Sequence, residues 1–335
     1  MQPIMTGKNH NGMHRVNLWP RVILSVSLGW FLAGCGGGDP IVESSPSPNG
    51  ADSTTATPDP LSYENITLTQ SGRTGQLQWK ITASLARYTP EQTAAALTSV
   101  TGEFYDAQGE PIRVTAASGD VQVQERRLTL TGAIQAEYPS QGLTLKAQQV
   151  EWIPDNNRIT ASERIVVRFQ DPEQSGRQSQ LEGSRLLWDT DNRVLTLERQ
   201  GEPVRLTSTA PELTLTATEM IWNLPGQTLQ AVGAVNLSGK PTPGDPEVNL
   251  RAATLTLTPN QATLSGDAYG RTARGDELWA QLIRWPLQGT TLYASGGVRY
   301  RQAGANLSLN GREAVVNWQT QTARLSGGTT TIQGF

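Results

Sequence analysis

The side chains that most often perform catalysis are scarce in this chain of 335 residues. It has two histidines, His10 and His14, and one cysteine, Cys35. Both histidines lie in an N-terminal segment that is typical of a cleaved leader, so the mature chain has no histidine. Ser-His-Asp catalysis, Cys-His catalysis and metal sites built from histidine or cysteine are therefore excluded. We expect a protein that is not an enzyme and uses neither a metal nor a cofactor.

Carboxylates are the remaining candidates for acid–base chemistry. Asp155, Asp189 and Asp191 stand in turn-like sequence, where Asp and Asn usually bond their own backbone. Turn formation is therefore their expected role, and a glycan hydrolase that uses carboxylates alone is the third-ranked hypothesis. No acidic loop reaches the number of oxygen ligands that calcium needs.

Residues 1–34 are predicted to be a secretory signal. They contain three basic residues, no acid and an apolar run, Val22–Ala33. The run has 12 residues, whereas a helix needs about 20 to cross a bilayer. It ends in Leu32-Ala33-Gly34-Cys35, which resembles the lipobox of bacterial lipoproteins, whose cysteine is acylated. The resemblance places the mature chain outside the cytoplasm, held on a membrane through lipidated Cys35. The expected location is the periplasm, at the inner membrane. The alternative anchor is an uncleaved N-terminal segment.

Residues 35–60 are rich in Gly, Pro, Ser and Thr, which predicts a flexible tether. Residues 61–335 are predicted to fold, with a subdivision near 172–180 as one option. The chain without the signal has 24 basic and 30 acidic residues, which gives a net charge of −6. A nucleic-acid partner is disfavoured, because phosphate binding requires a basic surface.

A ten-residue pattern recurs along the predicted folded part, most clearly in Leu143–Trp152, Leu213–Trp222 and Val248–Leu257. In each copy, apolar residues occupy every second position up to a small residue. After the small residue the apolar positions resume one residue later than strict alternation would place them, which we call the parity shift. The copies are spaced 28 to 36 residues apart, a repeat length that indicates an array of similar units. Eight copies end at Tyr88, Val121, Trp152, Trp188, Trp222, Leu257, Trp285 and Val316.

Alternation predicts strands with one apolar face, and a parity shift within a strand requires a bulge or bend. Each strand should therefore run along one wall, bend, and continue along a second wall with its apolar side inward. The return strands carry a glycine near the middle, for example Gly201 and Gly233. We predict an all-β fold: an elongated antiparallel β-jellyroll, or V-shaped folded sheet, as one long jellyroll or two fused ones. Only Pro90–Leu97 suggests a helical turn.

The inward side chains form either a closed core or a trough that holds a ligand, and we favour the trough. The residues predicted to line it and bind lipid are Leu143, Leu145, Val150, Trp152, Leu181, Leu186, Trp188, Leu213, Leu215, Met220 and Trp222. A weaker hypothesis assigns phosphate contacts to Arg164, Arg168, Arg205, Arg299 and Arg301.

Three segments in order carry a family resemblance: Trp79–Ala83, Val100–Gly109 with its Phe-Tyr-Asp-x-x-Gly sequence, and Leu128–Gly132. Together they resemble LptC, the periplasmic component of lipopolysaccharide export, and the later repeats resemble the OstA-like units of its partners. The resemblance implies a β-jellyroll that holds acyl chains of lipopolysaccharide inside and receives the lipid from an inner-membrane ABC transporter. The lipobox and the greater length depart from the family pattern.

The resemblance further implies transfer to a bridge protein by pairing of edge strands. The expected open edges are Tyr63–Leu68 at one end and Leu307–Leu309 with Ala323–Leu325 at the other.

Burial of acyl chains would supply the driving force for such a carrier. Each buried methylene contributes about 0.8 kcal/mol, so a twelve-carbon chain in water costs on the order of 10 kcal/mol. The rival hypothesis is a structural or adhesive β-solenoid lipoprotein whose apolar stripe is a dry core.

Overall fold

The computed structural model describes residues 61–72, 75–106, 108–153, 157–170, 177–240, 247–304, 307–320 and 322–332. They belong to one compact unit, Pro58–Phe335. The predictions for the signal, the tether, Cys35 and Asp155 concern residues outside this part. Among the described residues, no helix has both the length and the apolar character needed to span a membrane.

Strands account for nearly all regular structure in the described residues, where a single 3₁₀ turn, η1 (Pro139–Gln141), is the exception. The first ten strands are β1 (Ser62–Ser71), β2 (Leu77–Tyr88), β3 (Ala94–Tyr105), β4 (Pro111–Gln122), β5 (Arg127–Tyr138), β6 (Leu143–Ile153), β7 (Arg158–Gln170), β8 (Gln178–Asp189), β9 (Val194–Glu198) and β10 (Val204–Thr209). The others are β11 (Glu212–Ala217), β12 (Glu219–Asn223), β13 (Thr228–Lys240), β14 (Val248–Leu257), β15 (Gln261–Thr272), β16 (Glu277–Pro286), β17 (Thr291–Gln302), β18 (Leu307–Asn317), β19 (Thr322–Ser326) and β20 (Thr329–Ile332).

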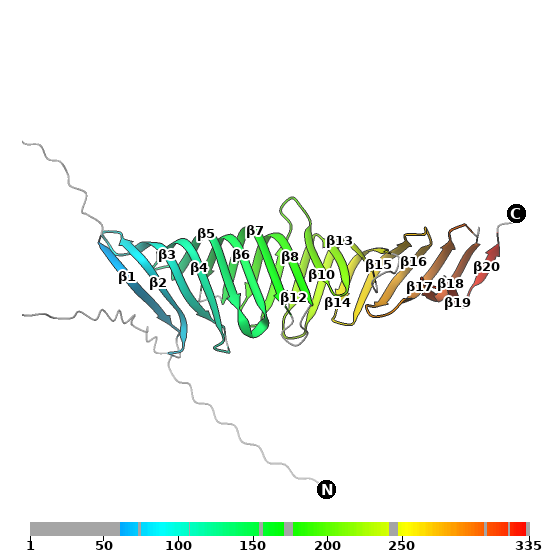
Figure 1. The fold of residues 1–335 in the computed structure, drawn as a ribbon, viewed down its shortest axis with the longest axis horizontal. Coiled ribbons are helices and arrows are strands. Elements are labelled where there is room, and N and C mark those ends of the chain that lie inside the picture. Colours follow the sequence, from blue (N-terminus) through cyan, green and yellow to red (C-terminus); the bar gives the residue numbers. More distant parts are fainter. Residues whose placement is uncertain are drawn as a thin grey trace, which may run out of the picture. The chain divides into compact units, whose positions relative to one another are not determined.

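These strands form one antiparallel sheet in which each strand pairs with its neighbours in the sequence. Figure 1 shows them following one another in chain order, from blue β1 to red β20. β9 and β10 both pair with β8, so they are two arms of one interrupted strand. β11 with β12, and β19 with β20, are interrupted in the same way. The predicted all-β, antiparallel jellyroll built from bent strands is confirmed.

The bends lie where the parity shift predicts them. In the pairing of β6 with β7 the register shifts between Lys146 and Gln149, next to the small residue Ala147 of the repeat. On the return strand β13, Gly233 and Ala234 have φ of 76° and 48°, in the left-handed region. A Cβ on Gly233 would also lie 2.7 Å from Oγ1 of Thr218, so both φ and space require glycine there.

The eight residues that end the repeats lie in one cross-strand row, which we call the terminal row. Successive pairs connect it, such as Val121 with Leu128, Leu128 with Trp152 and Trp152 with Ile159. The arms that carry the terminal row are the second wall. The arms on the other side of the bends are the first wall, where Leu145, Val167, Leu181, Leu206, Leu215, Leu237 and Leu250 form a corresponding inward row.

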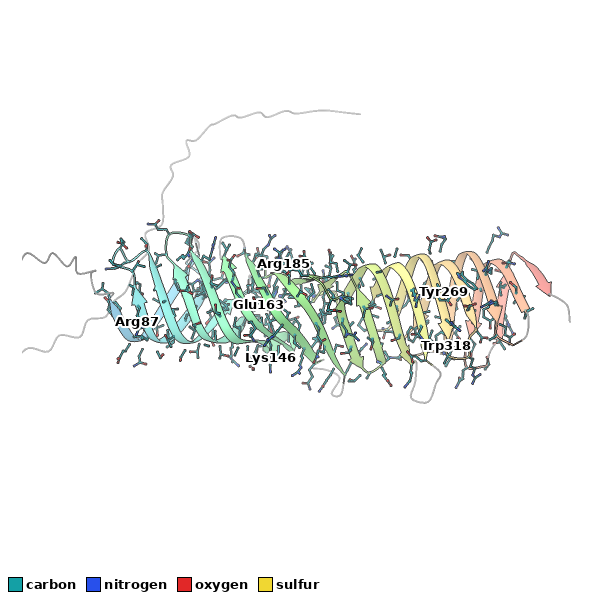
Figure 2. The ribbon with its side chains drawn as sticks, turned by 90° about the horizontal axis from the view of Figure 1, so that it is seen from above. Arg87, Lys146, Glu163, Arg185, Tyr269 and Trp318 are labelled. Carbon is teal, nitrogen blue, oxygen red and sulfur yellow. The ribbon has the colours of Figure 1, made fainter. Side chains whose placement is uncertain are left out.

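The core lies between the two walls, and the inward side chains of both rows are mostly buried. The walls contact one another: a Cβ on Gly239 of the first wall would lie 3.1 Å from Cη2 of Trp285 in the second. Charged side chains such as Lys146 and Arg185 lie on the outer faces (Figure 2).

Two sequence-based predictions about elements are wrong. Pro90–Leu97 makes no helical turn, because β3 starts at Ala94 and the segment before it is a turn. Ala95 and Leu97 are buried in register with Val121 and Gly119, and this burial outweighs helix propensity. Leu307–Leu309 is not an open edge either, because β20 pairs with that part of β18.

Candidate functional site

The outer ends of the two walls meet along a line that we call the mouth. Three aromatic pairs join the first wall to the second there: Phe104 with Trp152, Tyr138 with Trp188, and Phe169 with Trp222. Their ring centroids lie 4.2, 5.8 and 5.2 Å apart. Flat sheet neighbours three strands apart would be about 14 Å apart, so these contacts exist because the sheet is folded.

A cleft of about 370 Å³ opens in the mouth between β7 and β14. This volume is near the lower end of the roughly 300–1,000 Å³ range of ligand pockets. The apolar lining comes from both walls, with Leu206 and Phe169 from the first and Trp222, Leu229 and Leu257 from the second. The cleft therefore reaches the apolar side chains between the walls.

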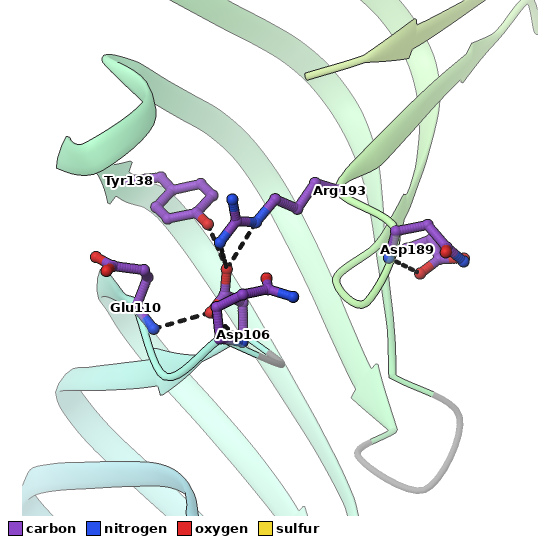
Figure 3. A network of polar contacts seen from close by, with 7 residues as sticks. Asp106, Glu110, Tyr138, Asp189 and Arg193 are labelled. Carbon is purple, nitrogen blue, oxygen red and sulfur yellow. Dashed lines mark hydrogen bonds and ion pairs between the residues drawn. The ribbon is translucent and has the colours of Figure 1, made fainter. Parts of the chain in front are cut away.

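A buried ion pair crosses the mouth beside this cleft (Figure 3). Nε of Arg193 donates a hydrogen bond to Oδ2 of Asp106 at 3.0 Å, and Nη2 lies 3.0 Å from the same oxygen. The Asp106 side chain is only 1% exposed. The Tyr138 hydroxyl donates to the same oxygen at 2.5 Å. The backbone N–H groups of Gln108 and Glu110 donate to Oδ1. Asp106 thus caps its own turn and ties the first wall to the second.

The electrostatics keep this carboxyl ionised. Burial raises the pKa of Asp106, but hydrogen bonds from Tyr138 and the Glu110 backbone, together with Arg193, outweigh burial and lower that pKa below its usual value. Burial and the Asp106 carboxylate both raise the pKa of the Tyr138 phenol, which therefore stays protonated. The contact is a stable hydrogen-bonded ion pair and not a proton-transfer pair.

A second arginine crosses the mouth on the other side of the cleft. Nη2 of Arg177, just before β8, donates to the backbone carbonyl of Pro259 at 3.0 Å. Arg177 and Arg193 both line the cleft. Two guanidinium groups therefore flank an apolar opening, an arrangement suited to a ligand with an apolar part and an anionic part.

The structure places the predicted lipid-binding residues in two environments. Leu143, Leu145, Val150, Trp152, Leu181, Leu186, Trp188, Leu213, Leu215 and Met220 are each no more than 5% exposed. Trp222 is partly exposed and lines the cleft. The expected continuous trough is not open in this structure, because side chains from both walls fill it along most of the described strands.

Four buried indole N–H groups at the outer end of the second wall have no acceptor within the described part of the chain. They belong to Trp152, Trp188, Trp285 and Trp318. A buried donor without a partner costs about 1–3 kcal/mol and calls for an explanation. The outer end of the second wall is therefore a place where the described interior leaves buried donors unsatisfied.

The apolar interior is also uncovered at both ends of the sheet. Ile66 and Leu68 of β1 are only partly buried, as are Leu309 of β18 and Leu325 of β19. Among the described strands, β1 pairs only with β2, and β19 and β20 pair only with β18. Each end thus presents an unpaired strand edge beside apolar side chains.

The carboxylates considered for catalysis have structural partners. Asp189 accepts from the backbone N–H of Asn192 at 2.9 Å, and Asp191 accepts from Nδ2 of Asn157 at 2.6 Å. Asp189, the last residue of β8, bonds the backbone of the turn that follows, as expected from its sequence context, whereas Asp191 in that turn bonds the side chain of Asn157 before β7. In the described residues, no three His, Cys, Asp or Glu side chains group together in a way that could hold a metal ion.

Sequence reasoning missed the bridges across the mouth. Asp106 lies in the Phe-Tyr-Asp-x-x-Gly segment, which from sequence indicates a family signature and no contact for this carboxylate. Arg193 is 87 residues away, and no sequence period relates the two. The available signal is an arginine in the turn that precedes β9, which is too common to single out.

Comparison with known families agrees with this architecture. A family profile described as "Lipopolysaccharide-assembly, LptC-related" matches residues 31–201, just over half of the chain. The chain belongs to the LptC-related family. The match to the LptC-related profile ends between β9 and β10, and the same rows continue through the later strands.

No curated protein matches this LptC-related chain. Among solved structures it is similar to LptH, described as the LptA-homologous periplasmic component of the conserved lipopolysaccharide transport device from Pseudomonas aeruginosa. The alignment has 14% identity and a TM-score of 0.25, and it covers 58% of this chain and 97% of that chain.

Proposed function

We propose that this protein is a periplasmic carrier that holds the acyl chains of lipopolysaccharide between the two walls. The observation that carries the proposal is the cleft in the mouth, where apolar side chains of both walls reach solvent beside two arginines and continue into a long apolar interior. Sugars and phosphates remain in water outside the walls. Membership of a lipopolysaccharide-assembly family supports this function over a structural or adhesive lipoprotein or a hydrolase.

Loading of acyl chains requires the walls to separate further than they do in this structure. The cleft is the place where separation can start, because the mouth contacts there are already interrupted. The Arg193 bridge and the aromatic pairs must then yield on one side, and the Arg177 contact on the other. The bends are the hinge, since a few backbone positions there can absorb the change in angle.

Photo-crosslinking tests whether lipid reaches the cleft. A photoreactive phenylalanine analogue at Trp222 is expected to form adducts with lipopolysaccharide in cells. The matched control is Ile221, the preceding residue of β12, whose side chain lies on the opposite face of the strand. Adducts only at position 222 support the carrier. Equal labelling at both positions, or labelling at neither, contradicts it.

We further propose that the carrier receives lipid from an inner-membrane ABC transporter and passes it to a bridge protein through its end strands. An added strand at either end would satisfy unpaired backbone groups and cover the adjacent apolar side chains, such as Leu68 and Leu325. Lipidated Cys35, or an uncleaved N-terminal segment, would hold the carrier at the membrane.

A second crosslinking experiment tests the end strands. The photoreactive analogue at the exposed Thr67 of β1 is expected to join the chain to another envelope protein of the transport pathway. At Thr256, on β14 in the middle of the sheet, no such product is expected. The same protein captured at both positions would show that the end strand is not the docking element.

A further inference from the structure

The outer face of the first wall carries a basic and aromatic patch between β14 and β17. Its first row consists of Arg251, Tyr269, Trp279 and Arg299, which are successive cross-strand partners. The second row, beside the turns at the mouth, consists of Asn249, Arg271, Glu277 and Arg301. Figure 2 labels Tyr269 on this part of the sheet.

Positive charge is in excess on this outer patch. Its lone carboxylate, Glu277, forms an ion pair with Arg301 and accepts a hydrogen bond from the Tyr269 hydroxyl at 2.8 Å. Within the described residues, no carboxylate lies within ion-pair distance of Arg251, Arg271 or Arg299. The surplus stands out because the whole chain has a net charge of −3.

Aromatic rings occupy the centre of the outer patch. The rings of Tyr269 and Trp279 lie 5.4 Å apart, and the Arg299 guanidinium carbon lies 4.5 Å from the centre of the Trp279 ring. A guanidinium held against a ring in this way keeps its N–H edge available for an anion. The cation is therefore positioned before any ligand binds.

Two shallow hollows flank these rings. One, of about 440 Å³, is lined by Thr214, Thr216, Asn236, Asn249 and Tyr269, among others. The other, of about 500 Å³, lies beside Trp279, where Gly297 contributes no side chain and Asn310 offers an amide. Hydroxyl and amide groups around an aromatic centre suit a polar ring better than a flat or apolar partner.

We propose that the outer patch binds the phosphorylated sugar portion of the glycolipid whose acyl chains lie between the walls. The inference rests on the proposed function, since it takes the ligand of the patch to be the headgroup of the lipid whose acyl chains lie between the walls. Arginines pair with phosphate oxygens, and the rings and amides contact the sugars. The patch thus extends recognition from the acyl chains to the headgroup.

Calorimetry with a glucosamine disaccharide that carries two phosphates and no acyl chains tests the proposal. The wild-type chain is expected to bind it, more weakly as ionic strength rises. The double variant Arg271→Gln/Arg299→Gln is expected to bind about tenfold more weakly or worse. The control is Arg284→Gln/Arg324→Gln, two exposed arginines on the second wall, which should bind like wild type.

Four results would overturn the proposal. Three of them are no binding by wild type, equal losses in the two double variants, and equal binding of the disaccharide without phosphates. A glutamate-rich peptide that binds the patch as tightly as the disaccharide would identify an acidic protein as the occupant instead. All four substituted arginines are exposed, so a matching thermal unfolding midpoint verifies that the fold is intact.

The outcome is separable from that of the proposed function. The disaccharide has no acyl chain, so its binding does not depend on the interior. Crosslinking of lipopolysaccharide at position 222 reports on the interior and does not depend on Arg271 or Arg299. Disaccharide binding without crosslinking would therefore refute the carrier and retain a sugar-phosphate site, whereas the reverse would refute the patch alone.

Discussion

Replacement of Arg193 by methionine is expected to lower the free energy of unfolding by about 2 kcal/mol, the range for hydrogen bonds to charged groups. The substitution keeps much of the side-chain volume and removes the cation that faces the buried Asp106 carboxylate. A buried charge that loses its partner is more costly than the pair was favourable. Urea denaturation of the purified chain measures the loss.

Arg185→Met is the matched control. Arg185 pairs with Glu198 at 3.1 Å, but their side chains are 42% and 33% exposed. Exposed pairs of this kind contribute about 0–1 kcal/mol. Similar losses in the two variants would show that the bridge across the mouth is no more than an ordinary surface pair.

The pH dependence gives the Arg193 prediction a second readout. The folded-state pKa of Asp106 is below its usual value, so its contribution is present above the unfolded value of about 3.9. That contribution is lost as the pH falls through the folded-state pKa. Without Arg193 the folded-state pKa moves back towards the unfolded value, so the acid-induced loss from Asp106 is smaller in the Arg193→Met chain. The stability difference between wild type and Arg193→Met should therefore shrink as the pH falls below about 3.9.

Trp188→Ala is expected to have the largest effect of any single substitution proposed for this protein, about 3–5 kcal/mol of lost stability. Trp188 is 1% exposed and contacts Tyr138 across the mouth, so its removal leaves a cavity between the walls. Thermal and urea unfolding measure the change. The variant tests directly whether this position belongs to the core.

Two further variants interpret the Trp188 result. Trp279→Ala, at a partly buried ring on the outer face, should cost much less. Trp188→Phe keeps an aromatic ring and removes an indole N–H that has no acceptor in the described part of the chain, so its cost should also be smaller. If Trp188→Ala were as mild as Trp279→Ala, the walls would be loosely held and the interior closer to an open trough.

The fold was largely predictable because its information is local. Alternation of apolar residues, a parity shift at a small residue and a turn after each terminal residue recur within every repeat. These signals define strands, bends and the terminal row without any contact distant in sequence. The prediction of a helical turn at Pro90–Leu97 failed for the opposite reason. Ala95 and Leu97 lie in a strand because they are buried against β4, a contact that the segment itself does not encode.

The site was predictable only in part. The sequence identified which side chains face inward, including Trp222 in the cleft. It could not show how closely the walls approach, because that depends on contacts across the fold such as Phe104 with Trp152. The bridge between Asp106 and Arg193 connects residues 87 positions apart and leaves no periodic trace.

The pairing of each strand with its sequence neighbours has a consequence for evolution. Because a hairpin of two bent strands contacts mainly the hairpins beside it, one can be duplicated or deleted while the others keep their partners. Strands must be gained or lost in pairs. Successive turns lie alternately at the ends of the first and second walls, and a single extra strand would move every later turn to the other wall. Proteins with this architecture can therefore differ in the length of the sheet by whole hairpins.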